Sequence, residues 1–367
     1  MISRRLLLAL TAAGLLPERL LAADASPRPL RILVLGGTRF IGRHVVDYAV
    51  GRGHKITLFN RGKSDPAAYP DLEQLRGDRG SDLTALRGRQ WDAVVDTSGY
   101  VPRHVRESAT LLAPGIGQYL FISSISVYAG WEKPNDEGSA LATTTDELSE
   151  KVTGENYGAL KALCEKAVAD AVPTGTTIVR PGYVVGPEDY TDRLTYWPLR
   201  VVRGGEMLAP GTPTDPVQFV DGRDLGRFCV RCLEQRTTGV FNAVHAPGTV
   251  TLGDVLETSR RLTASDAQIT WVAAEFLRGR KEMEELPIWS PPSGDTAADH
   301  LTRNDRAVRA GLETTPLATT LRDLLAWHAA RPEAERAKLK AGLSAEAERA
   351  LLAAWHASAA KPAGTGG

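Results

Sequence analysis

The segment Arg31–Val46 constrains the fold more than any other stretch of the chain. An apolar run of strand length stops at Gly36 and Gly37, and apolar residues at helical spacing follow from Phe40. This pattern predicts a strand, a tight turn and a helix start, with Gly42 allowing helix and strand to pack closely. The helix N-terminus then directs free N–H groups and a positive dipole at one point, where a pyrophosphate fits. We therefore expect a dinucleotide-binding turn that consists of Gly36, Gly37, Thr38, Arg39, Phe40, Ile41 and Gly42.

Basic residues near this turn favour NADP over NAD. Arg39 stands where the usual fingerprint has a glycine. The next predicted strand, residues 55–59, ends at Asn60 and Arg61, with Lys63 close behind, where an NAD site usually places an acid for the ribose 2′-hydroxyl. Arginine pairs well with a 2′-phosphate through charge-assisted hydrogen bonds. The alternative is that Arg61 and Lys63 are solvated loop charges.

Length and charge limit the classes of protein to consider. The chain has 367 residues and 43% hydrophobic content, enough for about two domains or one large α/β unit. Lys and Arg together number 44, as do Asp and Glu, so the formal net charge is zero. This balance gives no support for a nucleic-acid or anionic-membrane surface, and we expect no nucleic-acid partner.

The first 25 residues have the pattern of an export signal. Residues 1–5 include Arg4 and Arg5, an apolar stretch covers Leu6–Leu16, and small residues precede a cleavage point after Ala25. The stretch is too short to span a bilayer. The paired arginines are typical of a twin-arginine signal, which exports folded proteins. We expect a periplasmic product without a stable membrane anchor, and a retained anchor is the alternative.

The cysteines and histidines give no sign of a disulfide framework or a metal site. The three cysteines, Cys164, Cys229 and Cys232, leave one unpaired in any disulfide scheme. Cys229 and Cys232 have CxxC spacing, but the segment Asp224–Gln235 has the pattern of a helix and places both on its apolar stripe. We expect core packing there. The seven histidines lack metal-ligand spacing, so we expect no metal.

Strand and helix patterns alternate along the first half of the chain. Strands are predicted at residues 31–35, 55–59, 71–76, 91–96 and 118–122, with a helix at 105–112. The alternation indicates βαβ units and a Rossmann-type, doubly wound parallel sheet, which binds ligands beyond the carboxyl ends of its strands. At those ends we expect Asp78 to meet the adenine and a loop across the cofactor at Thr97, Ser98 and Gly99.

Candidate catalytic residues follow the fifth strand. A long amphipathic helix is predicted over residues 155–171, and its Tyr157 and Lys161 are four apart, hence on one face. A lysine ammonium beside a phenol lowers the phenol pKa and makes it useful as an acid or base. Ser124 at the end of the fifth strand is able to bond the same substrate oxygen. Without this context, Tyr157 and Lys161 would be an ordinary solvated pair. The polar segment 130–150 is expected to form a loop over the site.

The chain resembles the extended branch of the short-chain dehydrogenase/reductase superfamily, the NAD-dependent epimerase/dehydratase-like proteins. The resemblance covers roughly residues 30–330 and rests on an ordered set of segments: 36–42, 121–128, 157–161, 179–187, 218–225 and 239–242. Arg39 and the strand end Phe59–Gly62 look most like the chloroplast stem-loop-binding subgroup. The resemblance implies that Tyr157 is the acid/base, that Lys161 bonds the nicotinamide ribose and tunes Tyr157, and that Ser124 polarises the substrate oxygen. It also implies a cofactor contact at Pro181.

Two departures from the family pattern narrow the expected reaction. Dehydratases of this family have an acidic pair where this chain has Ile125 and Ser126, so dehydration is disfavoured. Nucleotide-sugar epimerases commonly carry an arginine for the substrate diphosphate where Val217 and Gln218 stand, which counts against a nucleotide diphosphate substrate. Other arginines that could supply this charge are Arg193, Arg200 and Arg203.

The sequence divides into four parts by these criteria: a signal at 1–25, a cofactor domain at 30–187, a substrate region at 188–330 and an extension at 331–367. The substrate region is interleaved with the last elements of the cofactor domain. Helices are expected at 252–262 and 317–330, and the extension is expected to be helical over 331–360 with a disordered tail.

We expect an epimerase-like enzyme that acts on a sugar or sugar derivative and keeps its NADP or NAD. An exported enzyme works best when each turnover returns its cofactor to the starting redox state. One alternative is an NADP-dependent alcohol dehydrogenase or ketone reductase that releases its cofactor. Another is a non-catalytic RNA- or ligand-binding protein on the same scaffold. The oligomeric state stays open, with a homodimer as one option.

Overall fold

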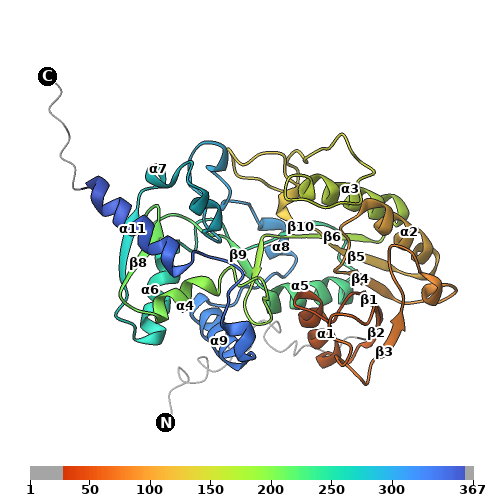
Figure 1. Cartoon of the computed structure of the whole chain (residues 1–367). Helices are drawn as coiled ribbons and strands as arrows, with labels where there is room; N and C mark the ends of the chain where they lie inside the picture. Colours follow the sequence, from red (N-terminus) through yellow and green to blue (C-terminus); the bar gives the residue numbers. More distant parts are fainter. Residues whose placement is uncertain (1–27, 360–367) are drawn as a thin grey trace, which may run out of the picture.

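A seven-stranded sheet forms the centre of the larger lobe (Figure 1). The computed structural model describes residues 28–359. The strand order is β10-β6-β5-β4-β1-β2-β3 and every neighbouring pair is parallel. This arrangement confirms the predicted doubly wound sheet. The strands are β1 (Arg31–Leu35), β2 (Lys55–Asn60), β3 (Glu73–Arg76), β4 (Ala93–Asp96), β5 (Gln118–Ile122), β6 (Thr176–Pro181) and β10 (Gly239–Ala243).

The sheet is buried on both faces, which is why its strands are nearly continuous apolar runs. In β1, Ile32 and Val34 belong to one core cluster, whereas Leu33 and Leu35 belong to the cluster on the opposite face. One face is covered by α1 (Ile41–Gly51) and α5 (Gly222–Glu234), which pack against each other. The other is covered by α2 (Pro102–Leu112) and α3 (Tyr157–Ala171). The result is three layers, with the carboxyl ends of the strands left open to ligands.

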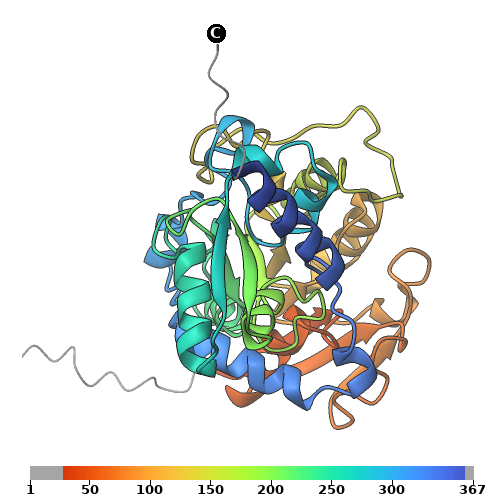
Figure 2. The ribbon, with the colours of Figure 1, turned by 60° about the vertical axis from the view of Figure 1, so that its left-hand side comes forward.

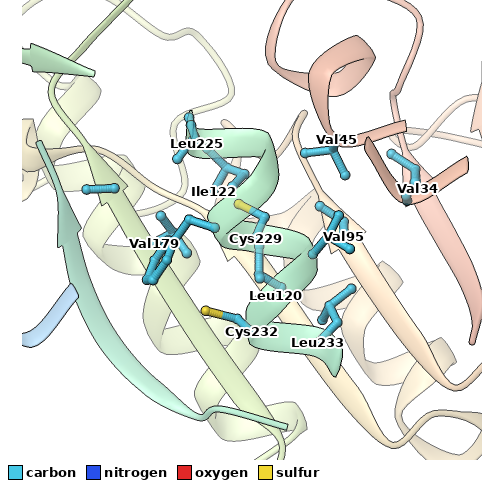
Figure 3. Packing of buried hydrophobic residues seen from close by; sticks show 14 of the residues in the cluster. Val34, Val45, Val95, Leu120, Ile122, Val179, Leu225, Cys229, Cys232 and Leu233 are labelled. Carbon is cyan, nitrogen blue, oxygen red and sulfur yellow. The ribbon is translucent and has the colours of Figure 1, made fainter. Parts of the chain in front are cut away.

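The two cysteines with CxxC spacing lie in the first of these cores. Figure 3 shows Cys229 and Cys232 on α5, among Leu120 and Val179 of the sheet. Both thiols are fully buried and free, and burial raises the pKa of Cys232 to about 12. The predicted packing role is therefore confirmed.

A smaller lobe has its own hydrophobic core. Its strands β8 (Glu206–Pro210) and β11 (Gln268–Val272) pair in parallel, and Figure 2 shows them side by side between α6 and α11. A second parallel pair, β7 (Tyr183–Val185) with β9 (Phe219–Asp221), lies where the chain passes between the lobes. The remaining helices are α4 (Tyr196–Val202), α6 (Leu252–Thr263), α7 (Ala274–Leu277), α8 (Asp305–Arg309), α9 (Leu317–Ala330), α10 (Glu333–Arg336) and α11 (Ala345–Ala359).

Several element boundaries differ from the sequence predictions. The helix predicted from residue 105 begins at Pro102, because proline fits the first turn of a helix, where its missing N–H is not needed. The continuous helix predicted over 331–360 is wrong: α10 and α11 are separate. Gly342, between them, has φ +90° and packs against the Tyr196 ring, so the chain turns there instead of remaining helical.

Two predicted segments cannot be compared with the structure. The signal at residues 1–25 and the end of the tail, residues 360–367, lie outside the described residues. Within residues 28–359, none of the helices has both the length and the apolar character needed to cross a bilayer.

Candidate active site

The turn after β1 has the tight geometry expected from its glycines. Gly36 and Gly37 have φ values of +106° and +93°, which side chains other than glycine rarely adopt. A Cβ on Gly42, in the first turn of α1, would lie closer than 3.0 Å to the backbone of Gly37. The helix start therefore sits directly against the turn, and its free N–H groups face the space beyond β1.

A cavity of about 490 Å³ opens at this point, along the carboxyl ends of the sheet. Most of the predicted cofactor-binding residues line it: Gly36, Gly37, Thr38, Arg39, Phe40, Ile41, Gly42, Asn60, Arg61, Asp78, Thr97 and Ser98. Gly99 is not among the lining residues. The cavity meets a helix N-terminus at a turn whose glycines have no room for a Cβ, so the residues present fit a dinucleotide.

Basic residues line this cavity near the end of β2. Arg39, Arg61 and Lys63 line it, and none of them forms an ion pair within residues 28–359. At the end of β2, the Asn60 side chain accepts a hydrogen bond from the Gly62 amide at 2.8 Å, so a neutral group occupies the position of the usual acid. Arg39 lies 4.0 Å above the centre of the Tyr190 ring. This cavity therefore presents unpaired positive charge to a ligand.

A buried ion pair beneath the cavity was missed by the sequence analysis. Arg79 donates from both terminal nitrogens to the two oxygens of Asp96, each at 2.5 Å, and Tyr119 donates to the same carboxylate at 2.8 Å. Burial alone would raise the pKa of Asp96, but the Arg79 charge and the hydrogen bonds from Arg79, Tyr119 and Ser98 together outweigh burial and hold the pKa below its usual value. The Ser98 amide also donates to Asp96, at 3.1 Å, so the pair fixes the loop that crosses the cavity.

A second cavity of about 450 Å³ continues from the first. The two share Phe40, Ile41, Thr97, Tyr100 and Tyr190. All three predicted catalytic residues, Ser124, Tyr157 and Lys161, line the second cavity, together with Pro181. Residues far apart in sequence thus meet at the junction of two adjoining cavities.

Close backbone packing positions Ser124 relative to Tyr157. After β5 the chain forms a 3₁₀ turn, Ile125–Val127, capped by the Ser124 hydroxyl, which accepts from the Ser126 amide at 3.1 Å. The helix α3 begins at Tyr157, and its next residue, Gly158, lies against the Ser126 carbonyl oxygen with no room for a Cβ. Glycine at this position lets the helix and the serine turn touch.

Lys161 is anchored by the backbone. Its Nζ donates to the carbonyl oxygens of Gly99 at 2.8 Å and of Ile122 at 2.6 Å. Burial lowers the pKa of Lys161 from 10.5 to about 8. An ammonium has three N–H donors, so one remains for a ligand. The Gly99 contact ties the crossing loop to α3, although Gly99 itself does not line the first cavity.

The expected effect of Lys161 on Tyr157 is not present. Burial raises the pKa of Tyr157 above its usual value, while a hydrogen bond with Ser124 and the Arg193 charge lower it by less. The prediction of a phenol acidified by Lys161 is therefore wrong for the protein alone. The physical reason is that the Tyr157 phenol is itself buried, a cost that four-residue spacing does not reveal, and Lys161 directs two of its donors to backbone carbonyls.

Of the three arginines considered for the substrate charge, one lines the second cavity. Arg193 lines the cavity, whereas Arg200 is buried against Glu348, 2.6 Å away, and Arg203 is exposed beyond α4. Gln218 also lines the cavity, but its side-chain amide donates to the carbonyls of His245 and Thr302 at 2.7 and 2.8 Å. Arg193 is therefore the arginine, of the three considered, that a substrate could meet.

Other lining residues gave no signal in the sequence. His300 and Asp299 come from a loop without periodicity, and Trp131 comes from the segment expected to lie over the site. The Trp131 carbonyl accepts from the Ala298 amide at 2.7 Å, which holds the two loops together. Within the part of the chain that the structure describes, no three His, Cys, Asp or Glu side chains gather in a way that could hold a metal ion.

Curated relatives cover part of the chain. The chloroplast stem-loop binding protein of 41 kDa b of Arabidopsis thaliana is 27% identical over 244 residues, 62% of this chain and 61% of that protein. The 2-alkyl-3-oxoalkanoate reductase of Stenotrophomonas maltophilia is 27% identical over 231 residues, 54% of this chain and 64% of that protein. The chain thus spans less than two thirds of the length of each of these relatives.

Solved structures share the fold. A UDP-glucuronic acid 4-epimerase from Bacillus cereus, in complex with NAD, aligns with 81% of this chain and 98% of its own at a TM-score of 0.59 and 15% identity. A UDP-N-acetylglucosamine 4-epimerase from Methanobrevibacter ruminantium aligns with 82% and 98% at 0.59 and 17% identity. The model of the NAD dependent epimerase/dehydratase family matches residues 32–243. These residues include the glycine turn, Ser124, Tyr157 and Lys161, and the chain belongs to the NAD dependent epimerase/dehydratase family.

Proposed function

We propose that this protein is an epimerase-like oxidoreductase that acts on a secondary alcohol of a sugar or sugar derivative and keeps its nicotinamide cofactor. The observation that carries the proposal is the common cavity of Ser124, Tyr157 and Lys161, continuous with the cavity at the glycine turn. Membership of the epimerase/dehydratase family and the sugar-nucleotide epimerases among the structural neighbours support it. A nicotinamide cofactor held at the glycine turn would supply reversible hydride transfer at the carbinol carbon.

In this proposal the protein side chains handle the substrate oxygen and its proton. Ser124 donates a hydrogen bond to the oxygen. Tyr157 as the phenolate takes the hydroxyl proton as the alcohol becomes a ketone, and as the phenol it gives the proton back on the reverse step. Lys161 holds the ribose with its remaining N–H. Ile125 and Ser126 supply no acid pair for water loss, so the keto intermediate is reduced again on either face rather than dehydrated.

We also propose that NADP is preferred to NAD. Arg39 and Arg61 line the first cavity without a carboxylate partner, and Asn60 stands where an acid would oppose a 2′-phosphate. The family name and the structures in complex with NAD leave this preference open. Export to the periplasm in folded form, from the arginine-containing segment at 1–25, is a further proposal that agrees with a retained cofactor.

The first test is mass spectrometry of the small molecules released when the protein, purified without added cofactor, is denatured. Stoichiometric NADP would support both retention and the roles of Arg39 and Arg61. The second test is Tyr157→Phe, which should abolish turnover while leaving cofactor binding intact, because only the phenol oxygen is removed. Turnover equal to that of the parent would refute the mechanism.

A reductase that exchanges its cofactor is the second candidate. The similarity to 2-alkyl-3-oxoalkanoate reductase favours it. It predicts a net change in nicotinamide absorbance with a ketone substrate, whereas the epimerase-like cycle returns the absorbance to its starting value after each turnover. Protein that is folded but binds cofactor only on addition would favour this second candidate.

A further inference from the structure

The second cavity is also lined by donors that no acceptor within residues 28–359 satisfies. Arg193 carries its charge without an ion pair within residues 28–359, and its Nε donates to the Thr191 hydroxyl at 3.0 Å. This leaves the terminal nitrogens of its guanidinium without a protein acceptor. Such a planar, permanently charged fork is suited to a carboxylate or phosphate.

His300 provides a second donor on the lining of the same cavity. The backbone amide of Gln218 donates to His300 Nδ1 at 3.1 Å, so the neutral ring carries its proton on Nε2. His300 lines the cavity and is only 4% exposed. Its Nε2 is buried and has no hydrogen-bond partner within residues 28–359. Burial lowers the pKa of His300 despite the opposing charge of Asp299, so the ring is a neutral donor at pH 7. A buried N–H without an acceptor is costly unless a ligand supplies one.

One ring fixes both donors. The Arg193 guanidinium lies 4.9 Å from the centre of the Tyr183 ring, and the His300 ring stacks on the same ring at 6.2 Å with 22° between planes. Tyr183 belongs to β7, a strand rather than a loop, so the two donors share a rigid support. Their position is therefore built into the fold and does not depend on a mobile side chain.

The neutral Gln218 stands where the family resemblance implies an arginine for a substrate diphosphate. The side-chain amide of Gln218 bonds two backbone carbonyls, and its Oε1 accepts from the Thr302 amide at 3.0 Å. Gln218 thus has no spare group for an anion. Asp299, whose Oδ2 accepts from the Ser290 hydroxyl at 2.7 Å, is the acidic residue that lines the second cavity and is suited to sugar hydroxyls.

We propose that Arg193 and His300 form an anion-recognising subsite, so that the substrate carries a carboxylate or phosphate in addition to the carbinol that Tyr157 meets. This inference rests on the proposed function for the position of the reacting carbinol. The anion itself could be the carboxylate of a sugar acid, the phosphate of a sugar phosphate or the diphosphate of a nucleotide sugar. The recognising chemistry is common to all three.

Calorimetric titration of the cofactor-loaded protein tests the subsite without needing turnover. The probes are glucose, glucuronate, glucose 6-phosphate and UDP-glucose. At least one anionic probe should bind more tightly than glucose, and which one does so identifies the source of the anion. Arg193→Gln should weaken that probe about 10- to 100-fold and leave glucose unchanged. Failure of every anionic probe to bind more tightly than glucose would overturn the proposal.

Matched variants separate recognition from folding. Arg203→Gln removes an exposed arginine outside the cavity and should leave all affinities unchanged. His300→Asn keeps an acceptor near the Nδ1 position for the Gln218 amide but removes the Nε2 donor, and should weaken the anionic probe alone. If Arg193→Gln does not fold, the comparison of the anionic probes with glucose in the parent protein still tests the proposal. A protein that binds an anion through Arg193 but shows no hydride transfer would refute the proposed reaction and keep the subsite.

Discussion

Substitution of Gly158 by alanine tests whether backbone contact sets the catalytic geometry. Alanine in a helix is normally more favourable than glycine by about 1 kcal/mol. At Gly158 the sign should reverse, because the new Cβ would lie well within 3.0 Å of the Ser126 carbonyl oxygen. That oxygen belongs to the backbone of the capped turn and cannot rotate away. The first turn of α3 must therefore retreat from the turn that carries Ser124.

The size of this retreat sets the expected effect. Restoring ordinary van der Waals contact requires a movement of about 1.5 Å, and a misplacement of about 1 Å already costs about 100-fold in rate. Overpacking at a well-packed contact costs about 1–3 kcal/mol of unfolding free energy. We expect Gly158→Ala to show both losses, while cofactor affinity, set mainly by the first cavity, changes much less.

Urea denaturation would measure the loss of stability, and turnover of the sugar probe that binds most tightly would measure the loss of rate. Gly154→Ala is the matched control, because it lies in the loop just before the same helix and a Cβ there has no neighbour within 4 Å. The control should match the parent in both assays. If Gly158→Ala also matches the parent, then the contact between α3 and the serine turn does not position Tyr157, and the reasoning fails.

Three further predictions concern charge. Asp96→Asn should lower the free energy of unfolding in urea by about 3–5 kcal/mol, because it leaves the Arg79 charge buried and unpaired; a loss below about 1 kcal/mol would contradict this. Arg61→Ala should weaken NADP about 10-fold in a fluorescence titration without changing NAD, and equal weakening of both would exclude a 2′-phosphate role. For Lys161, folding lowers the pKa from 10.5 to about 8, so between these pH values the unfolded chain holds a proton that the folded protein has lost, and stability rises with pH. At about 1.4 kcal/mol per pH unit the gain is at most about 3 kcal/mol, and it should vanish in Lys161→Met when the two are compared in urea at pH 7.5 and 10.

Local patterns in the sequence were sufficient to predict the first half of the fold. The strand at 118–122 and the helix at 317–330 have the predicted bounds, because each is a strongly periodic run between turn residues. The short strands of the smaller lobe were not predicted. β8 and β11 are separated by more than 50 residues, and neither alternates clearly, so pairing rather than local preference makes them strands.

In the candidate site, too, the sequence predicted the features that depend on local residues and missed those that depend on the folded chain. Glycine spacing placed the turn at residues 36–42 against a cavity, since the requirement for glycine is local. The pKa of Tyr157 was predicted wrongly because burial is a property of the assembled protein and not of helical spacing. His300 could not be found at all, because its unsatisfied N–H depends on a hydrogen bond from Gln218, 82 residues away.

The position of β10 has a consequence for synthesis. This strand is the last of its sheet to be translated and occupies the edge beside β6, which precedes it by about 60 residues. While the ribosome has released only the chain up to β9, the edge of β6 exposes unpaired backbone groups that can template wrong partners. The helix α5 also follows β9, so at that stage it does not yet pack on α1 and one face of the sheet is still uncovered. We therefore expect the chain to be prone to wrong pairing until residue 243 has emerged, and a fragment truncated before that point should aggregate.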